Sequence, residues 1–352
     1  MVQYLPWSEK TLQACIHSSQ NGKIPVIDLE LTARCSAAHC IYCDSMPVVC
    51  PNPIDAELPL EDTLNIMEQA VKKGLKWIYT CGLGEPLEDK RFFPLLDLIK
   101  HNDVKLSIFT NGQFIRSIEI AKRLKESNVN IILKMDTFDE NKFDHILGGT
   151  GRAKRIYNAI DYLLEVGYTD VGEEGYTDLA FSIVPTQLTK DTIPQVVKFC
   201  FDHNIFPSVG ELEQAGNVVN LNLFASLGLS EKNLNDIKLS AELAQIGYLR
   251  PICPAILCGL HIDNKGNCIV DTVTGLNCKW FLLKDPHTTV IGNIHDYSID
   301  ELAIKVKKYR EYCWEKNRQK IDEYETISYT FGGCGGNPAQ VISLYKEINW
   351  IR

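Results

Sequence analysis

Three cysteines within nine residues carry the clearest chemical signal in this sequence. Cys35, Cys40 and Cys43 form the pattern CxxxxCxxC shortly after an apolar run. Thiolates spaced in this way bind metals, and three of them leave one iron of a [4Fe–4S] cluster open to a substrate or cofactor. A zinc site with His39 or Cys50 as the fourth ligand is the competing interpretation of the same residues.

A second group of cysteines lies in the last hundred residues. The chain has 13 cysteines, but its N-terminus lacks the basic and then apolar segment of a secretion signal, so disulfides are not expected. The cysteines of this group that could bind a metal are Cys253, Cys258, Cys268, Cys278 and Cys334. They predict a second site, which could hold an iron–sulfur cluster or a structural zinc ion.

The elements that must position these residues are short apolar strands that alternate with amphipathic helices. Strands are predicted over residues 24–31, 77–80, 105–110, 130–135, 179–184 and 206–213, and helices over 60–73, 92–100, 118–126, 153–166 and 193–203. This alternation indicates a parallel sheet wound with helices. We therefore expect an α/β fold, a partial (β/α)6 TIM-type barrel followed by a small cysteine-rich α+β extension. A hairpin is predicted over 260–271 in the extension.

Glycine and polar residues follow successive predicted strands. Gly84 and Glu85 follow the second strand, Asn111 the third and Asp136 the fourth. In a barrel of parallel strands the chemistry lies at the carboxyl ends of the strands. Because the first cysteine group follows the first strand, we expect all these residues at one reactive rim.

These motifs together resemble the radical S-adenosylmethionine (SAM) superfamily. The family signature CxxxCxxC has an aromatic residue before its last cysteine; here Tyr42 occupies that place and the first gap has one extra residue. The resemblance covers roughly residues 25–217. It implies a [4Fe–4S] cluster on Cys35, Cys40 and Cys43 that cleaves SAM reductively. The resulting 5′-deoxyadenosyl radical would abstract hydrogen from an unactivated C–H bond.

The resemblance also implies which residues bind SAM. The segment Gly82-Leu-Gly-Glu-Pro is similar to the family's GGE motif, so Gly84 and Glu85 are expected to receive the methionyl amine. The remaining residues that the resemblance assigns to SAM are Tyr42, Asn111, Lys134, Asp136, Ser182 and Glu213.

The C-terminal cysteines resemble those of the SPASM or twitch extensions found in some radical SAM enzymes. The resemblance implies one auxiliary [4Fe–4S] cluster held by Cys258, Cys278 and Cys334. Cys268 or Cys253 would complete the ligand set, and structural zinc is the alternative. The expected division is an N-terminal segment (1–24), the barrel (25–220), a helical bridge (221–250) and the extension (251–352).

The resemblance favours maturation of a ribosomally made peptide, with dehydrogenation or epimerisation of a sugar-like or aminocyclitol-like metabolite as the alternative. A non-catalytic zinc or iron–sulfur scaffold is the hypothesis from another class. About two dozen residues precede the first strand, too few for a leader-binding domain, so a peptide substrate implies a separate recognition protein. Cluster reduction implies a reductase, flavodoxin or ferredoxin as electron donor.

Composition narrows the remaining partners. The 352 residues carry a net charge of −9 without a long basic run, which argues against nucleic-acid binding as the main activity. No apolar run approaches the length of a membrane-spanning helix. We therefore expect a cytoplasmic protein that binds neither nucleic acid nor membrane.

Overall fold

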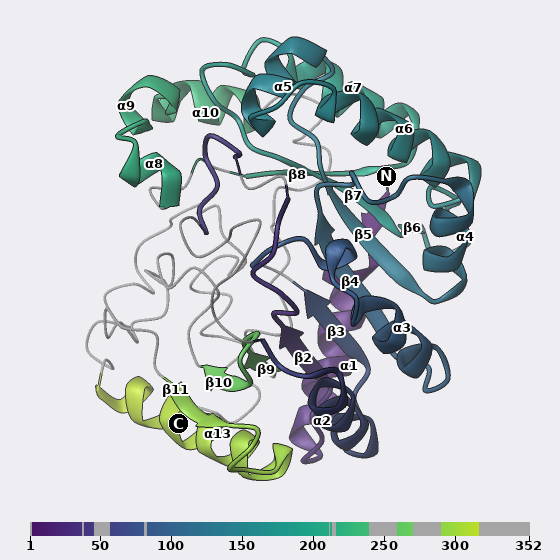
Figure 1. Ribbon diagram of the computed structural model, residues 1–352, viewed down its shortest axis with the longest axis vertical. Coiled ribbons are helices and arrows are strands. Elements are labelled where there is room, and N and C mark those ends of the chain that lie inside the picture. Colours follow the sequence, from purple (N-terminus) through teal and green to yellow (C-terminus); the bar gives the residue numbers. More distant parts are fainter. Residues whose placement is uncertain are drawn as a thin grey trace.

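Parallel strands alternating with helices build most of the described chain (Figure 1). The computed structural model describes residues 2–36, 39–45, 57–80, 83–210, 212, 216–238, 259–269 and 290–316. The strands β2 (Val26–Leu29), β3 (Trp77–Thr80), β4 (Lys105–Thr110), β5 (Val129–Lys134), β7 (Leu179–Ile183) and β8 (Phe206–Val209) are parallel neighbours in this order. All six lie where the sequence predicts strands. In the described residues the sheet stays open, which confirms the α/β fold and the partial barrel.

The predicted helices are present on the outer side of this sheet (Figure 1). They are α2 (Leu60–Lys72), α3 (Phe92–Lys100), α4 (Ile118–Glu126), α6 (Arg152–Glu165) and α7 (Ile193–Asp202). In α6, Ile156, Ile160 and Leu163 recur at helical spacing and are buried in the main core. An additional short helix, α5 (Glu140–Leu147), precedes α6; Asp139 caps it, and Gly148 ends it in the left-handed conformation.

The inner face of the sheet has a separate lining. Alternate residues of a strand point to opposite faces, so Ile131 and Leu133 join the helix-side core while Ile132 faces inward. Tyr4 packs against Ile132 and Ala180 on this inner side. It belongs to an N-terminal segment of β1 (Gln3–Tyr4), η1 (Leu5–Trp7) and α1 (Glu9–Gln20), in which β1 pairs with β6 (Tyr176–Thr177). This segment therefore occupies one end of the barrel interior.

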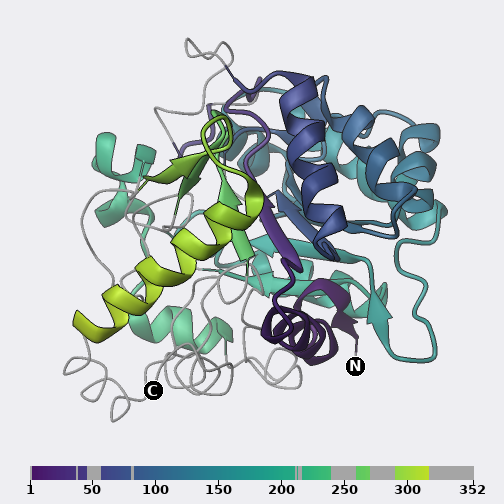
Figure 2. The ribbon, with the colours of Figure 1, turned by 90° about the horizontal axis from the view of Figure 1, so that it is seen from below.

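The predicted hairpin extends the same sheet beyond β2. Strand β9 (Gly259–Ile262) runs parallel to β2, and β10 (Asn267–Ile269) is antiparallel to β9 and to β11 (Val290–Asn293). Gly266 has φ +83°, the left-handed conformation that the tight turn requires. Helix α13 (Ile299–Lys316) crosses beside these strands, as Figure 2 shows, and buries Leu302 in the main core. The hairpin and barrel thus share one sheet and one core.

Among the described residues, β8 is followed by the short helices α8 (Gly216–Asn220), α9 (Phe224–Leu227) and α10 (Glu231–Lys238). In the described part of the chain, no helix combines the length and the apolar character needed to cross a bilayer.

Candidate active site

The loop that carries Cys35, Cys40 and Cys43 follows β2 and is held from three directions. The N–H of Glu85 donates to the Arg34 carbonyl at 2.8 Å. The N–H of Ile41 donates to the carbonyl of Ile146, at the end of α5, at 3.0 Å. Asn217 of α8 donates its N–H to the Cys43 carbonyl at 2.9 Å and its side-chain amide to the Cys40 carbonyl at 2.8 Å. The exits of β3 and β8 and the end of α5 therefore fix the path of the cysteine loop.

Glycines allow two of these approaches. A Cβ on Gly84 would lie 2.2 Å from the Thr32 carbonyl oxygen, and one on Gly216 would lie 2.2 Å from the Cys43 carbonyl oxygen. Both residues have positive φ, +68° and +48°, which glycine adopts without strain. The GGE-like motif predicts Gly84, whereas no local signal gives Gly216 a contact with a loop over 170 residues earlier.

The surroundings of Cys35, Cys40 and Cys43 suit side chains that bind a metal. Each cysteine is partly exposed, and Asn111 Nδ2 lies 3.9 Å from Cys35 Sγ, within range of an N–H···S hydrogen bond. Burial raises the pKa of Cys40 and raises that of Cys43 to about 11. Such thiols need a metal to lose their protons near neutral pH. Within the described residues, no group of three His, Cys, Asp or Glu side chains is arranged to hold a single metal ion.

Glu85 joins the ends of β3 and β4. Its carboxylate is buried and accepts hydrogen bonds from the Thr110 hydroxyl at 2.7 Å, the Asn111 N–H at 2.7 Å and the Leu87 N–H at 3.2 Å. Burial raises the pKa of Glu85 to about 7, although these hydrogen bonds favour the ionised form. The side chain therefore braces the rim beside the cysteine loop, as well as bringing negative charge to it.

Asp136, Lys134 and Tyr42 form a buried polar group at the end of β5. Asp136 is fully buried; it accepts hydrogen bonds from the Tyr42 hydroxyl and, at 2.8 Å, from the Val184 N–H. Lys134 Nζ lies 2.9 Å from Asp136 Oδ2 and 4.4 Å from the centre of the Tyr42 ring. Asp136, predicted as a SAM contact, thus bonds to protein groups through both of its oxygens.

The other predicted SAM residues are less completely placed. Ser182 on β7 pairs in register with Lys134 on β5, so the two side chains face the same side of the sheet. Glu213 lies outside the described residues. The structure therefore brings Tyr42, Lys134 and Ser182 to the same rim as Glu85 and Asn111.

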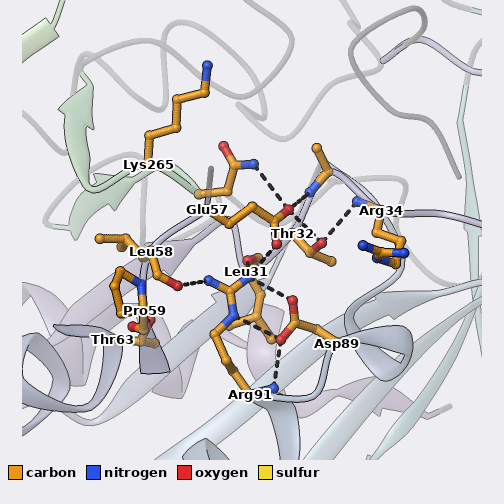
Figure 3. Close-up of polar contacts among 12 residues, drawn as sticks. Leu31, Thr32, Arg34, Glu57, Leu58, Pro59, Thr63, Asp89, Arg91 and Lys265 are labelled. Atoms are coloured by element: carbon orange, nitrogen blue, oxygen red, sulfur yellow. Dashed lines mark hydrogen bonds and ion pairs between the residues drawn. The ribbon is translucent and has the colours of Figure 1, made fainter. Parts of the chain in front are cut away.

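A buried arginine also anchors the start of the cysteine loop (Figure 3). Arg91 binds both oxygens of Asp89, pairs with Glu57 at 2.8 Å and donates to the carbonyls of Leu31 and Leu58. Its side chain is only 4% exposed. Asp89 is two residues from Arg91, but Leu58, Glu57 and Leu31 are 33, 34 and 60 residues away, so no local pattern predicts the whole network.

Glu57 extends that network in two directions. Its Oε1 accepts hydrogen bonds from the Thr32 hydroxyl at 2.7 Å and the Ala33 N–H at 2.8 Å, just before Cys35. The same oxygen accepts a bond from the side-chain amide of Asn264, in the hairpin turn, at 3.4 Å. The cysteine loop and the hairpin are thus joined through one carboxylate.

The second predicted metal site is described at only one of its cysteines. Cys253, Cys258, Cys278 and Cys334 lie outside the described residues. Cys268 is fully buried in the main hydrophobic core and pairs in register with Ile262 of β9. Strand β9 begins at Gly259, the residue after Cys258. Gly259 is three positions from Ile262, the partner of Cys268, which is about 10 Å at the rise of a strand.

The described geometry agrees with known proteins of one class. Residues 29–200 match the family model of the radical SAM superfamily. The chain belongs to this superfamily, whose members are enzymes that use a [4Fe–4S] cluster and SAM. The cysteine loop, with its three thiols and the Asn111 donor, suits the cluster.

Among individual proteins, the chain is 29% identical over 317 residues to the "Probable GTP 3′,8-cyclase" of Methanocella arvoryzae, covering 85% of this chain and 94% of that protein. It is 30% identical over 145 residues to the tungsten-containing aldehyde ferredoxin oxidoreductase cofactor-modifying protein of Pyrococcus furiosus, covering 40% of this chain and 39% of that one.

Two solved structures share the fold. The AdoMet-bound structure of anSMEcpe superposes with a TM-score of 0.57 at 15% identity, covering 93% of both chains. Streptococcus suis SuiB bound to S-adenosylmethionine superposes with a TM-score of 0.53 at 18% identity, covering 80% of this chain and 65% of SuiB. At these identities the likeness concerns the fold alone.

Proposed function

We propose that this enzyme binds a [4Fe–4S] cluster through Cys35, Cys40 and Cys43 and uses it to cleave SAM reductively. The supporting observation is that Glu85 and Asn111 meet the cysteine loop at one rim of the sheet. When bound, the cluster and SAM supply the 5′-deoxyadenosyl radical that abstracts hydrogen from an unactivated C–H bond. The residues of the chain hold the loop, orient SAM and exclude water.

We assign the methionyl amine of SAM to Gly84 and Glu85. The glycine segment touches the cysteine loop through its backbone, and the carboxylate behind it supplies negative potential. The other residues proposed to contact SAM are Tyr42, Asn111, Lys134, Ser182 and Glu213. Asp136 completes the set by holding the Tyr42 hydroxyl and the Lys134 ammonium.

We also propose an auxiliary [4Fe–4S] cluster in the C-terminal extension, with Cys258, Cys278 and Cys334 as ligands. The fourth ligand is Cys268 or Cys253. The core position of Cys268, among apolar side chains and away from the start of β9, supports Cys253. The division into residues 1–24, 25–220, 221–250 and 251–352 is part of the same proposal.

The substrate that we propose is a ribosomally made peptide. The SPASM-like cysteine pattern supports this. The fold shared with SuiB supports it as well, because the structure of SuiB bound to its precursor peptide SuiA superposes on this chain with a TM-score of 0.53. A peptide-recognition protein and a flavodoxin, ferredoxin or reductase would be the partners, in the cytoplasm. A small metabolite, a sugar or a nucleotide, is the second candidate, because the similarity to the GTP 3′,8-cyclase relative extends over most of both chains.

Anaerobic reconstitution tests the proposal. Dithionite and SAM should yield 5′-deoxyadenosine, and about eight irons per chain would match two cubanes. Replacing Cys35, Cys40 and Cys43 by Ala should abolish cleavage and remove about four irons. Zinc in place of iron, or cleavage by the triple variant, would refute the assignment. Incubation with a precursor peptide encoded beside the gene, and separately with GTP, decides between the two substrate classes.

A further inference from the structure

One lysine brings a fixed positive charge to the cysteine loop. Lys134, the last residue of β5, places Nζ 4.4 Å from the ring centre of Tyr42, which stands between Cys40 and Cys43 in the loop. The same Nζ lies 3.2 Å from the Tyr42 hydroxyl oxygen and 2.9 Å from Asp136 Oδ2. Three contacts on two rigid partners hold the ammonium in one place.

The ion pair is oriented relative to the loop. Asp136 is fully buried behind the lysine and is fixed by the Val184 N–H at 2.8 Å, whereas the Lys134 side chain keeps 21% of its surface exposed. The exposed end of the pair is therefore the positive one, and it lies 4.4 Å from the centre of the Tyr42 ring, which belongs to the cysteine loop.

We propose that Lys134 tunes the reduction potential of the cluster held by Cys35, Cys40 and Cys43. This inference rests on the proposed function. In the step concerned, the [4Fe–4S]²⁺ cluster accepts one electron from a low-potential flavodoxin or ferredoxin, or from dithionite in vitro, and becomes [4Fe–4S]⁺. The reduced cluster carries one more negative charge, which a nearby ammonium stabilises. Lys134 thus favours reduction before SAM is engaged.

The size of the effect follows from Coulomb's law. A unit charge roughly 10 Å from the cluster, at an effective dielectric constant of about 20, changes the reduction equilibrium by roughly tenfold. Solvent around the partly exposed lysine screens part of this, so the expected loss on removing the ammonium is about threefold to tenfold. A tenfold change corresponds to 59 mV for a one-electron couple.

The experiment is an EPR-monitored redox titration of reconstituted protein without SAM. Lys134→Gln and Lys134→Met should lower the ratio of reduced to oxidised cluster at a given potential by about threefold to tenfold. Lys134→Arg keeps the charge and should titrate like the wild type. Asp136→Asn removes the opposing charge and should shift the ratio in the other direction, which a merely disturbed structure would not produce.

Lys125→Gln is the matched control. Lys125 pairs with Asp178 at 2.8 Å and stands 5.0 Å from the ring centre of Tyr168, so it repeats the same arrangement. It lies in the last turn of α4, before the start of β5, whereas Lys134 ends β5. The two ends of that strand are roughly 17 Å apart at the rise of a strand. This variant should leave the potential unchanged.

The outcomes separate the two proposals. A wild-type protein that assembles no cluster refutes the proposed function and this inference with it. Equal potentials in wild type, Lys134→Gln and Asp136→Asn refute the inference alone. A change in SAM affinity without a change in potential also refutes it, because Lys134 would then be a SAM ligand only. If the neutral variants lose iron, Asp136→Asn against Lys134→Arg still tests the sign.

Discussion

Arg91 allows a sharp prediction about how the cysteine loop is held. Its guanidinium is surrounded by the carboxylates of Asp89 and Glu57 and by the carbonyls of Leu31 and Leu58. The Arg91 and Asp89 side chains are 4% and 6% exposed, so water cannot replace the lost bonds. Arg91→Met keeps most of the apolar stem and removes every one of these donors.

The expected loss is large because charges remain behind. Removing one partner of a buried ion pair costs about 3–5 kcal/mol of unfolding free energy, since the other charge stays buried and unpaired. Arg123→Met is the matched control: Arg123 also pairs with an aspartate, Asp97 at 3.2 Å, but both side chains are about half exposed. Exposed pairs contribute about 0.2–1 kcal/mol. Arg91→Lys should fall between the two, because an ammonium cannot reach all four partners.

Urea unfolding of the three variants beside the wild type measures these differences. Arg91 binds the Leu31 carbonyl and Glu57, and both position the residues just before Cys35. The iron content after reconstitution should therefore also fall in Arg91→Met and not in Arg123→Met. Losses of unfolding free energy that agree within about 1 kcal/mol in the two Met variants would show that the buried network contributes no more than a surface pair.

Three further predictions concern the rim and the extension. Burial raises the pKa of Glu85 from 4.5 to about 7, so the folded state holds the proton to a higher pH than the unfolded state does. The free energy of unfolding, relative to that of Glu85→Gln, should therefore fall by about 3 kcal/mol as the pH rises from about 4.5 to about 7. A difference between the two proteins in urea unfolding that stays unchanged across that range would contradict this. Gly216→Ala should lose iron because its Cβ meets the Cys43 carbonyl oxygen at 2.2 Å, whereas Gly22→Ala, also at positive φ but with open space around it, should lose about 1 kcal/mol and no iron. Cys268→Ala should keep its full iron content, and a drop of about four irons would identify Cys268 as a cluster ligand.

Local pattern was sufficient for the strands and helices of the barrel. Buried strands read as short apolar runs, as in Ile131 to Leu133, and helices such as α6 repeat apolar residues every three or four positions. Helix α5 was not predicted because it has only eight residues, most of them polar. Its apolar residues Phe143, Ile146 and Leu147 span little more than one turn, which is too short to show a helical repeat. Residues 9–20 have a weak apolar stripe, so α1 was not predicted either.

Contacts between distant segments could not be predicted in the same way. No periodicity in residues 259–262 indicates that they pair in parallel with β2, which lies over 200 residues earlier. The partners of Arg91 and the glycine contact of Gly216 have the same character, because each depends on the final fold. For Asp136, the strand-end position was predicted, but its bonds to Tyr42, Lys134 and Val184 appear only when β5, β7 and the cysteine loop are placed together.

Long-range contacts couple the hairpin of residues 259–269 to the cysteine loop. Glu57 Oε1 accepts bonds from Thr32 and Ala33 at the start of the loop and from Asn264 in the hairpin turn. The Leu58 N–H adds a 2.8 Å bond to the Asn264 carbonyl, and Arg91 fixes Glu57 from the other side. A shift of the hairpin must therefore break bonds to a carboxylate that also orients the residues before Cys35. Since Arg91 would leave buried charges if it moved, the lower-energy response is for hairpin and loop to move together. This ties the position of the hairpin to that of the cysteine loop.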